Sequence, residues 1–160
     1  MDRITHLLAL MERGDRAFNA RDWTTLDTVH HPDMIAHVPG ISEPIRGRDA
    51  HKAAMNGLFE MFPDIRVETP YEVGFGGGDW ITVLTRANGT LAGSEKRFDV
   101  EFAQSVRWEA ERIIEIRTSG TPRPRPGNSA WRSGRRRGED HDPPRTGDRR
   151  GEPAARDGPS

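Results

Sequence analysis

Nearly all of the apolar side chains in this 160-residue chain lie before residue 120. Only four follow that point: Ala130, Trp131, Ala154 and Ala155. Seven of the twelve prolines also fall in the last forty residues. Four apolar side chains cannot offset the backbone entropy lost on ordering such a segment, at roughly 1–2 kcal/mol per residue. We therefore expect one folded domain over residues 1–119 and a disordered Arg/Pro/Gly-rich tail over residues 120–160.

The charges divide at the same point. The first 120 residues carry 14 basic and 19 acidic side chains, whereas the rest carry 10 basic and 6 acidic ones. Because phosphate binding needs clustered basic side chains, an acidic domain excludes nucleic acid as its main ligand. The run Arg135-Arg136-Arg137 leaves RNA or anionic lipid as a weak alternative for the tail. An altered reading frame in GC-rich DNA would give a similar composition, so a native tail and a frameshifted tail both stay open.

The chain has no cysteine, which excludes disulfides, thiolate nucleophiles and zinc–sulfur sites. Its N-terminal region has no uninterrupted apolar stretch preceded by basic residues. We therefore expect neither a signal peptide nor a membrane span, and a cytoplasmic location.

Three N-terminal segments have apolar residues at helical spacing. The first predicted helix covers residues 2–20, and Asp22 suits the N-cap of a short second helix. Asp49 suits the cap of a third helix that runs to Phe62, and we expect its buried stripe to consist of Met55, Leu58, Phe59 and Phe62. The segment between the second helix and the next strand contains His30, His31, Pro32 and Asp33. We interpret His31-Pro32-Asp33 as a turn that leaves His30 and His31 exposed.

The rest of the domain has the alternating pattern of strands. Strands are predicted at residues 34–38, 65–73, 80–91, 97–108 and 113–118. The clearest alternation places these residues on one face, which we expect to be buried: Phe98, Val100, Phe102, Val106 and Trp108. The element order predicts an α+β domain with helices on one face of a strongly curved sheet, and a cavity between the layers.

Several short motifs occur in this order along the chain. They are Phe18-Asn19-Ala20-Arg21-Asp22, His31-Pro32-Asp33, Pro44-Ile45-Arg46-Gly47, Phe62-Pro63-Asp64 and Arg112-Ile113-Ile114-Glu115-Ile116-Arg117. With them the chain resembles the SnoaL-like polyketide cyclases of the nuclear transport factor 2-like superfamily over about residues 5–117. The resemblance implies a cone of three helices on a curved mixed sheet around a central pocket. It also implies a homodimer, a small hydrophobic ligand, and an intramolecular aldol reaction that needs no metal and no cofactor.

Three polar residues are predicted to do the chemistry of such a pocket. Gln104 shares the apolar face of its strand, so its amide could donate to a carbonyl or enolate oxygen, or simply bond a neighbouring strand or a buried water. His37 follows the first strand at the expected pocket mouth, and an imidazole can transfer protons near neutral pH. Alternatively, strict alternation with Met34, Ala36 and Val38 would turn its side chain away from their face. Asp64 follows the third helix and could share this acid/base work, or only accept backbone amides. The side chains expected to contact substrate are Val38, Phe59, Phe102 and Trp108.

The chain departs from its relatives at the positions that carry their chemistry. The His and Asp of the characterised cyclases fall on Gln104 and Thr118, and neither side chain is a base at neutral pH. The three functional positions of the ketosteroid isomerases fall on Gly14, Val38 and Gln104, which excludes the isomerase mechanism. Two functions stay open: acid/base catalysis on a polyketide or similar hydrophobic carbonyl compound, and ligand binding without turnover. An epoxide hydrolase is a third, although it usually needs two acidic residues and only Asp64 is a candidate.

Overall fold

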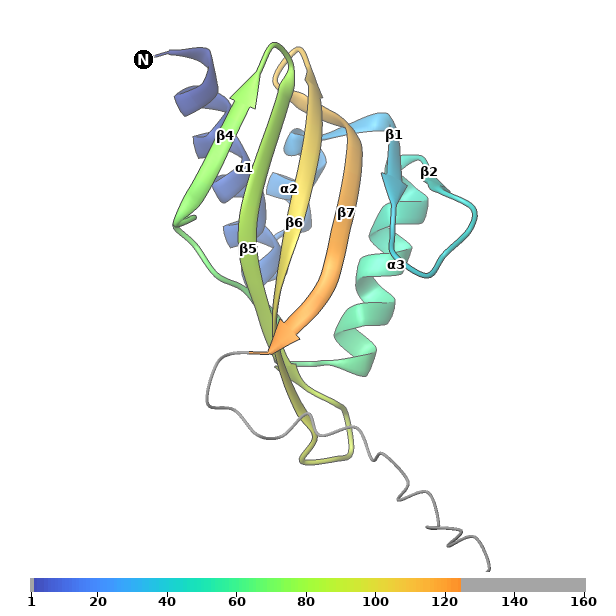
Figure 1. The fold of residues 1–160 in the computed structure, drawn as a ribbon. Coiled ribbons are helices and arrows are strands. Elements are labelled where there is room, and N and C mark those ends of the chain that lie inside the picture. The colour runs from blue at the N-terminus through green and yellow to red at the C-terminus, as the bar shows by residue number, and fades with distance from the viewer. Residues whose placement is uncertain (1, 125–160) are drawn as a thin grey trace, which may run out of the picture.

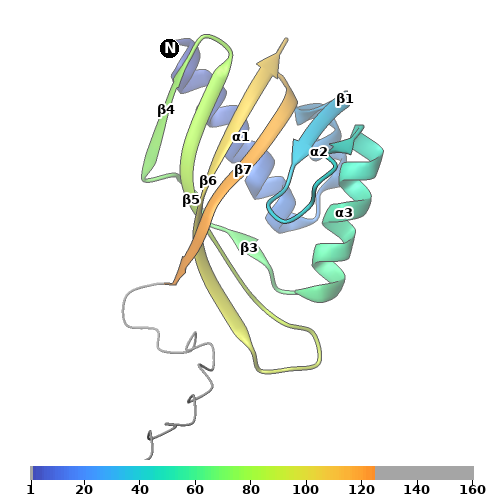
Figure 2. The ribbon, with the colours of Figure 1, turned by 45° about the vertical axis from the view of Figure 1, so that its right-hand side comes forward.

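We describe the protein from a computed structural model, which defines the backbone of residues 2–124 and the side chains of residues 2–119. The basic tail beyond Pro124, with its predicted disorder, lies outside the described residues. The described part contains three helices and seven strands (Figure 1). The helices lie on one side of a curved sheet, and α3 runs beside β1 (Figure 2). This is the α+β cone expected from the sequence.

The first two helices begin where the sequence indicates. Helix α1 spans Arg3–Ala20, and the Asp2 carboxylate accepts a hydrogen bond from the Thr5 amide. Helix α2 spans Trp23–Val29, and Asp22 caps it in the same way, as predicted, by accepting from the Thr25 amide at 3.0 Å. The inner face of α1 buries four residues at spacings of three and four: Leu7, Met11, Gly14 and Ala17.

Helix α3 (Arg48–Met61) differs from its prediction at its start and on its inner face. Its N-cap is Gly47, with φ of 88°, and Asp49 lies in the first turn and not at the cap. Of the expected buried stripe, only Met55 is fully buried, and Leu58 is 37% exposed. Both side chains line a cavity. The stripe therefore faces an open pocket, which explains its partial exposure.

Strand β1 (His30–His37) corrects the interpretation of His31-Pro32-Asp33 as a turn. The strand begins directly after α2 and pairs in parallel with β7 (Arg112–Pro124). The register shifts between His30 and Ile35, so the intervening residues bulge out of the ladder. Pro32, which has no amide hydrogen to donate, lies in this interruption.

The sheet order is β2-β1-β7-β6-β5-β3, with β4 also paired to β5. The other members are β2 (Ile45–Arg46), β3 (Arg66–Val67), β4 (Val73–Gly77), β5 (Trp80–Thr90) and β6 (Arg97–Glu109). All neighbouring pairs are antiparallel except β1 and β7. The strand predicted over residues 65–73 is therefore split into β3 and the start of β4. Pro70, which cannot donate to a ladder, lies between the two.

The predicted inner face of β6 is buried most deeply at one end. Val106 and Trp108 are 0% and 1% exposed and lie in the main apolar core, whereas Phe98, Val100 and Phe102 are half-buried. The β5–β6 hairpin extends beyond the helices at the end that carries Phe98 (Figure 2). The inner-face side chains of β6 are therefore most buried where the helices cover the sheet, and less buried where the hairpin extends beyond them.

Strand β7 continues to Pro124, beyond the Thr118 end predicted from the sequence. Its last residues pair with β6, Arg123 opposite Glu101 and Pro124 opposite Val100. Ladder hydrogen bonds therefore extend regular structure past the apolar part of the sequence. The domain limit at residue 119 stays a prediction.

Candidate active site

A cavity of about 300 Å³ lies between the helices and the inner face of the sheet. All three helices contribute to its wall, together with β1, β3, β5, β6 and β7. Most of the lining is apolar. The polar lining residues are Asp15, His30, His37, His51, Gln104 and Thr118. An apolar cavity with a few polar groups is the usual form of a small-molecule site.

Gln104 and Thr118 are neighbours in this cavity. They are direct cross-strand partners in the β6–β7 ladder, and both side chains line the pocket. The Gln104 amide has no hydrogen-bond partner among residues 2–119, so it is free to bond a ligand. These are the positions at which the resemblance places the His and Asp of other cyclases. Here they present an amide and a hydroxyl, which donate and accept hydrogen bonds but do not serve as bases near neutral pH.

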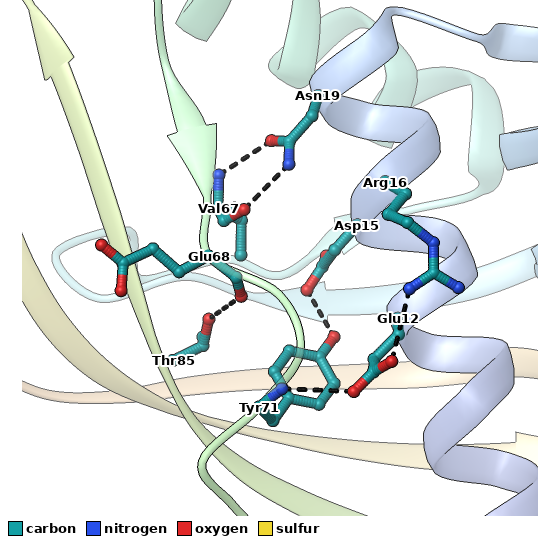
Figure 3. Close-up of polar contacts among 8 residues, drawn as sticks. All are labelled: Glu12, Asp15, Arg16, Asn19, Val67, Glu68, Tyr71 and Thr85. Atoms are coloured by element: carbon teal, nitrogen blue, oxygen red, sulfur yellow. Dashed lines mark hydrogen bonds and ion pairs between the residues drawn. The ribbon is translucent and has the colours of Figure 1, made fainter.

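Asp15 brings a carboxyl group to the cavity from α1. The Tyr71 hydroxyl donates a hydrogen bond of 2.5 Å to Asp15 Oδ2 (Figure 3). Burial raises the pKa of Asp15 to about 6, against the opposing effect of the Tyr71 hydrogen bond. Burial and the neighbouring Asp15 carboxylate raise the pKa of the Tyr71 phenol, so the phenol remains the donor. Asp15 is thus an acid/base group that titrates close to neutrality.

Two histidines form a second polar group in the wall. The rings of His30 and His51 meet edge to face, with centroids 5.0 Å apart. Burial lowers the pKa of His30 to about 3 and that of His51 to about 4, so both are neutral at physiological pH. His51 Nδ1 is buried without a hydrogen-bond partner in the described part of the chain. The expectation that His30 is exposed is wrong: it is 6% exposed, because it belongs to β1 and pairs with Ile113 of β7.

His37 borders the cavity, but its imidazole has a partner on the outer side of the sheet. Its Nε2 lies 3.3 Å from Oε1 of Glu115, which Arg107 and Arg117 also contact. The preceding residue, Ala36, is 1% exposed and lines the cavity. Because successive side chains of a strand alternate between faces, the His37 imidazole points away from the cavity. Val38, the next residue along, lines the cavity at 37% exposure.

Three other predicted site residues do not line this cavity. Asp64 is exposed, and its carboxylate accepts hydrogen bonds from the amide and hydroxyl of Thr90, at 2.6 and 2.8 Å. Phe59 packs against Phe18 in a small cluster with α1 and α2. Trp108 lies in the main core. Of the predicted substrate contacts, Val38 and Phe102 are lining residues.

Sequence reasoning missed Asp15, His30 and His51. Asp15 lies four residues after Met11 and three before Phe18, within the apolar stripe of α1. His51 lies four residues before Met55 on α3. Polar residues on apolar helical faces could therefore have identified both. His30 gave no such indication, because its burial depends on the distant strand β7.

Helices packed on one face of a curved, unclosed mixed sheet around a central pocket define the nuclear transport factor 2-like fold. The family model for the SnoaL-like polyketide cyclases matches residues 9–119, and the chain belongs to that family. No curated protein sequence matches the chain. Among residues 2–124, no helix has the length and hydropathy needed to cross a membrane. In the same segment, no three His, Asp or Glu side chains are grouped as metal ligands would be.

Solved structures share this fold at low sequence identity. A SnoaL-like polyketide cyclase homologue from Jannaschia sp. CCS1 is 22% identical with a TM-score of 0.65, covering 74% of this chain and 88% of that one. IdmH from Streptomyces antibioticus, a proposed polyketide cyclase, is 23% identical with a TM-score of 0.62, covering 69% and 88%. AclR from Streptomyces galilaeus, a proposed hydroxylase, is 16% identical with a TM-score of 0.63, covering 76% and 82%. These likenesses concern the fold and not the reaction.

Proposed function

We propose that the protein is an enzyme that performs cofactor-independent acid/base chemistry, of the intramolecular aldol type, on a polyketide or similar hydrophobic carbonyl compound. The observation that carries the proposal is the Gln104 amide, which has no hydrogen-bond partner among residues 2–119 and lies beside Thr118 in a mostly apolar cavity. A polar amide in such surroundings is suited to a ligand oxygen. Membership of the cyclase family supports the same reaction class.

The cavity wall fits a largely hydrophobic compound. Its volume of about 300 Å³ lies at the lower end of the range for small-molecule sites. Side chains such as Phe102, Val106 and Ile116 offer apolar contact from the sheet, and Met55 offers it from α3. Burial of apolar ligand surface against them supplies affinity at about 25 cal/mol per Å². The few polar groups then fix the orientation of the ligand.

Gln104 acts as the donor to the oxygen on which negative charge develops. Removal of a proton beside a carbonyl leaves an enolate, whose oxygen gains charge as the reaction proceeds. A fixed N–H donor in a dry site stabilises that oxygen more in the transition state than in the ground state, which lowers the barrier. The Thr118 hydroxyl, opposite Gln104, can provide a second hydrogen bond.

Ligand binding without turnover is the second candidate function. It is favoured by one observation: an amide and a hydroxyl occupy the two positions at which the family's acid/base residues fall. Epoxide hydrolysis has less support, because Asp15 is the one carboxyl group among the described lining residues and that reaction usually uses two.

The outer face of the sheet favours a homodimer, the form in which we propose the protein acts. Val73, Phe75 and Leu84 share one face of the β4–β5 ladder and are 44%, 60% and 40% exposed. Covering these side chains with a second copy would remove apolar surface from water. Light scattering tests the dimer, and a monomer at micromolar concentration would contradict it.

We also propose that the protein acts in the cytoplasm and in secondary metabolism.

The experiment that tests the function uses hydrogen–deuterium exchange at carbon. Linear β-keto esters and aromatic polyketide intermediates are incubated with the protein in D₂O, and NMR follows exchange and ring closure. We expect exchange beside a carbonyl to be faster than in the absence of the protein, and this acceleration to decrease by about 10²-fold in Gln104→Leu. The matched control is Ser105→Ala, because Ser105 points to the other face and bonds Thr82. Tight binding of these compounds, with exchange no faster than in the absence of the protein, would favour the binding protein.

A further inference from the structure

The polar groups of the cavity leave one chemical role unassigned. Gln104 and Thr118 donate hydrogen bonds, but an enolisation also needs a group that accepts the proton from carbon. His30 and His51 face the same cavity, but buried imidazoles that resist protonation are weak bases. The His37 imidazole is engaged with Glu115. Asp15 remains as the lining residue with a suitable atom.

We propose that Asp15 is the catalytic base of this cavity and that Tyr71 is the residue that positions its carboxylate. The inference rests on the proposed function, because it names the proton acceptor for that reaction. Tyr71 holds Oδ2 of Asp15, which leaves Oδ1 for the substrate proton. The Tyr71 backbone is fixed in turn, since its amide donates to Glu12 Oε1 at 3.2 Å (Figure 3).

The step balances without any further reactant. The bond between hydrogen and the carbon beside the carbonyl breaks, and the proton passes to Asp15. The electron pair moves to the carbonyl oxygen, which Gln104 stabilises. The enolate carbon then attacks a second carbonyl of the same molecule, a carbon–carbon bond forms, and the new alkoxide takes the proton back from Asp15.

The surroundings of Asp15 suit a base that works near neutral pH. The charged groups beside it are Glu12 and Arg16 on α1, and they form an ion pair with each other at 3.3 Å. From the segment between β3 and β4, the neutral Tyr71 phenol donates a hydrogen bond to it. With its pKa at about 6, the carboxyl group is ionised at pH 7 and above, yet it is a stronger base than an ordinary aspartate.

A substrate-independent test uses 5-nitrobenzisoxazole, which opens when a base removes its carbon-bound proton. The proton passes to the base, the nitrogen–oxygen bond breaks, and a coloured cyanophenolate forms with no other reagent. We expect the full-length protein to accelerate this opening and Asp15→Asn to lose about 10²-fold or more. Asp33→Asn is the matched control, because Asp33 is exposed on β1. A wild-type rate no higher than that of Asp15→Asn overturns the proposal.

The pH profile separates a positioning role of Tyr71 from a merely structural one. The wild-type rate is expected to fall as the pH drops through about 6. The Tyr71 hydrogen bond holds the pKa of Asp15 down, so Tyr71→Phe should move this fall to higher pH. A lower rate with an unmoved profile would contradict the assignment. This second measurement keeps the test valid if Asp15→Asn fails to fold.

The two proposals fail in different ways. If Asp15 opens 5-nitrobenzisoxazole but the protein accelerates proton exchange in no carbonyl compound, the base is real and the proposed substrate class is wrong. If the wild type and Asp15→Asn accelerate the exchange of carbonyl compounds equally over the protein-free rate, the function stands and Asp15 is not its base.

Discussion

Asn19 and Val67 exchange two hydrogen bonds, both of 2.8 Å, between one side-chain amide and one backbone residue (Figure 3). The Asn19 amide thereby acts as a strand partner for β3, whose Val67 lines the cavity. Asn19→Ala leaves the amide and carbonyl of Val67 without these partners, so we expect the free energy of unfolding to fall by about 1–3 kcal/mol. Urea denaturation measures this.

Asn19→Asp is the matched variant for that pair. A carboxylate can accept from the Val67 amide but cannot donate to the Val67 carbonyl. We therefore expect Asn19→Asp to be destabilised as well, despite its similar size. Wild-type stability in both variants would show that the paired hydrogen bonds do not hold β3 to α1.

Asp15→Asn should stabilise the protein at pH 7.5. Burial raises the pKa of Asp15 from 3.8 to about 6, so between these values the folded state holds a proton that the unfolded state has released. The contribution of this group to stability thus falls as the pH rises through that window, and above it the ionised carboxyl is a net cost. Removing the charge should therefore raise the free energy of unfolding by up to about 3 kcal/mol. Urea titrations at pH 7.5 and pH 4 should show the gain only at the higher pH.

Acid should destabilise the protein through His30 and His51. Burial holds the pKa of each ring well below 6.5, at about 3 and about 4. As the pH falls below 6.5, these two imidazoles bind protons in the unfolded chain but not in the folded chain. The free energy of unfolding therefore decreases. His51→Gln should flatten this dependence. An unchanged slope in His51→Gln would mean that the ring is protonated in the folded state.

Two neighbouring glycines of β4 should respond differently to a single added methyl group. A Cβ on Gly76 would lie 2.4 Å from the Trp80 backbone oxygen, which cannot move without disturbing the β4–β5 hairpin. A Cβ on Gly77 meets nothing within 4 Å. Gly76→Ala should therefore lower stability by about 1–3 kcal/mol, and Gly77→Ala should change it by less than about 0.5 kcal/mol. Equal thermal midpoints for the two variants would count against this close approach.

Local sequence was sufficient where a residue's partners are near it in the chain. The Asp22 cap depends on Thr25, three residues away, and the alternation of β6 places Gln104 among apolar residues without knowledge of its neighbours. Asp15 could also have been predicted as a site residue from the local sequence. A carboxyl group within an apolar helical stripe is costly to bury unless it has a hydrogen-bond partner or a functional role.

Local sequence was not sufficient where distant pairing overrides a local preference. His31-Pro32-Asp33 has turn composition, yet parallel pairing with β7 draws it into a strand and buries His30. The partner of Asp64 is Thr90, 26 residues further along, and no local pattern indicates that contact. The end of β7 was underestimated because ladder pairing with β6, and not apolar content, carries the chain to Pro124.

Strand β7 is the last element of the described chain, yet it lies in the interior of the sheet, between β1 and β6. On the ribosome, β1 and β2 therefore emerge long before the strand that joins them to the rest. A chain that stops short of Arg112 would not simply lose an edge strand. It would lose the strand that joins β1 and β2 to β6, β5 and β3. Such pairing across most of the sequence is slow to form, so the rate of folding should depend on β7. Until it docks, the inner faces of both pieces remain available to chaperones or to one another.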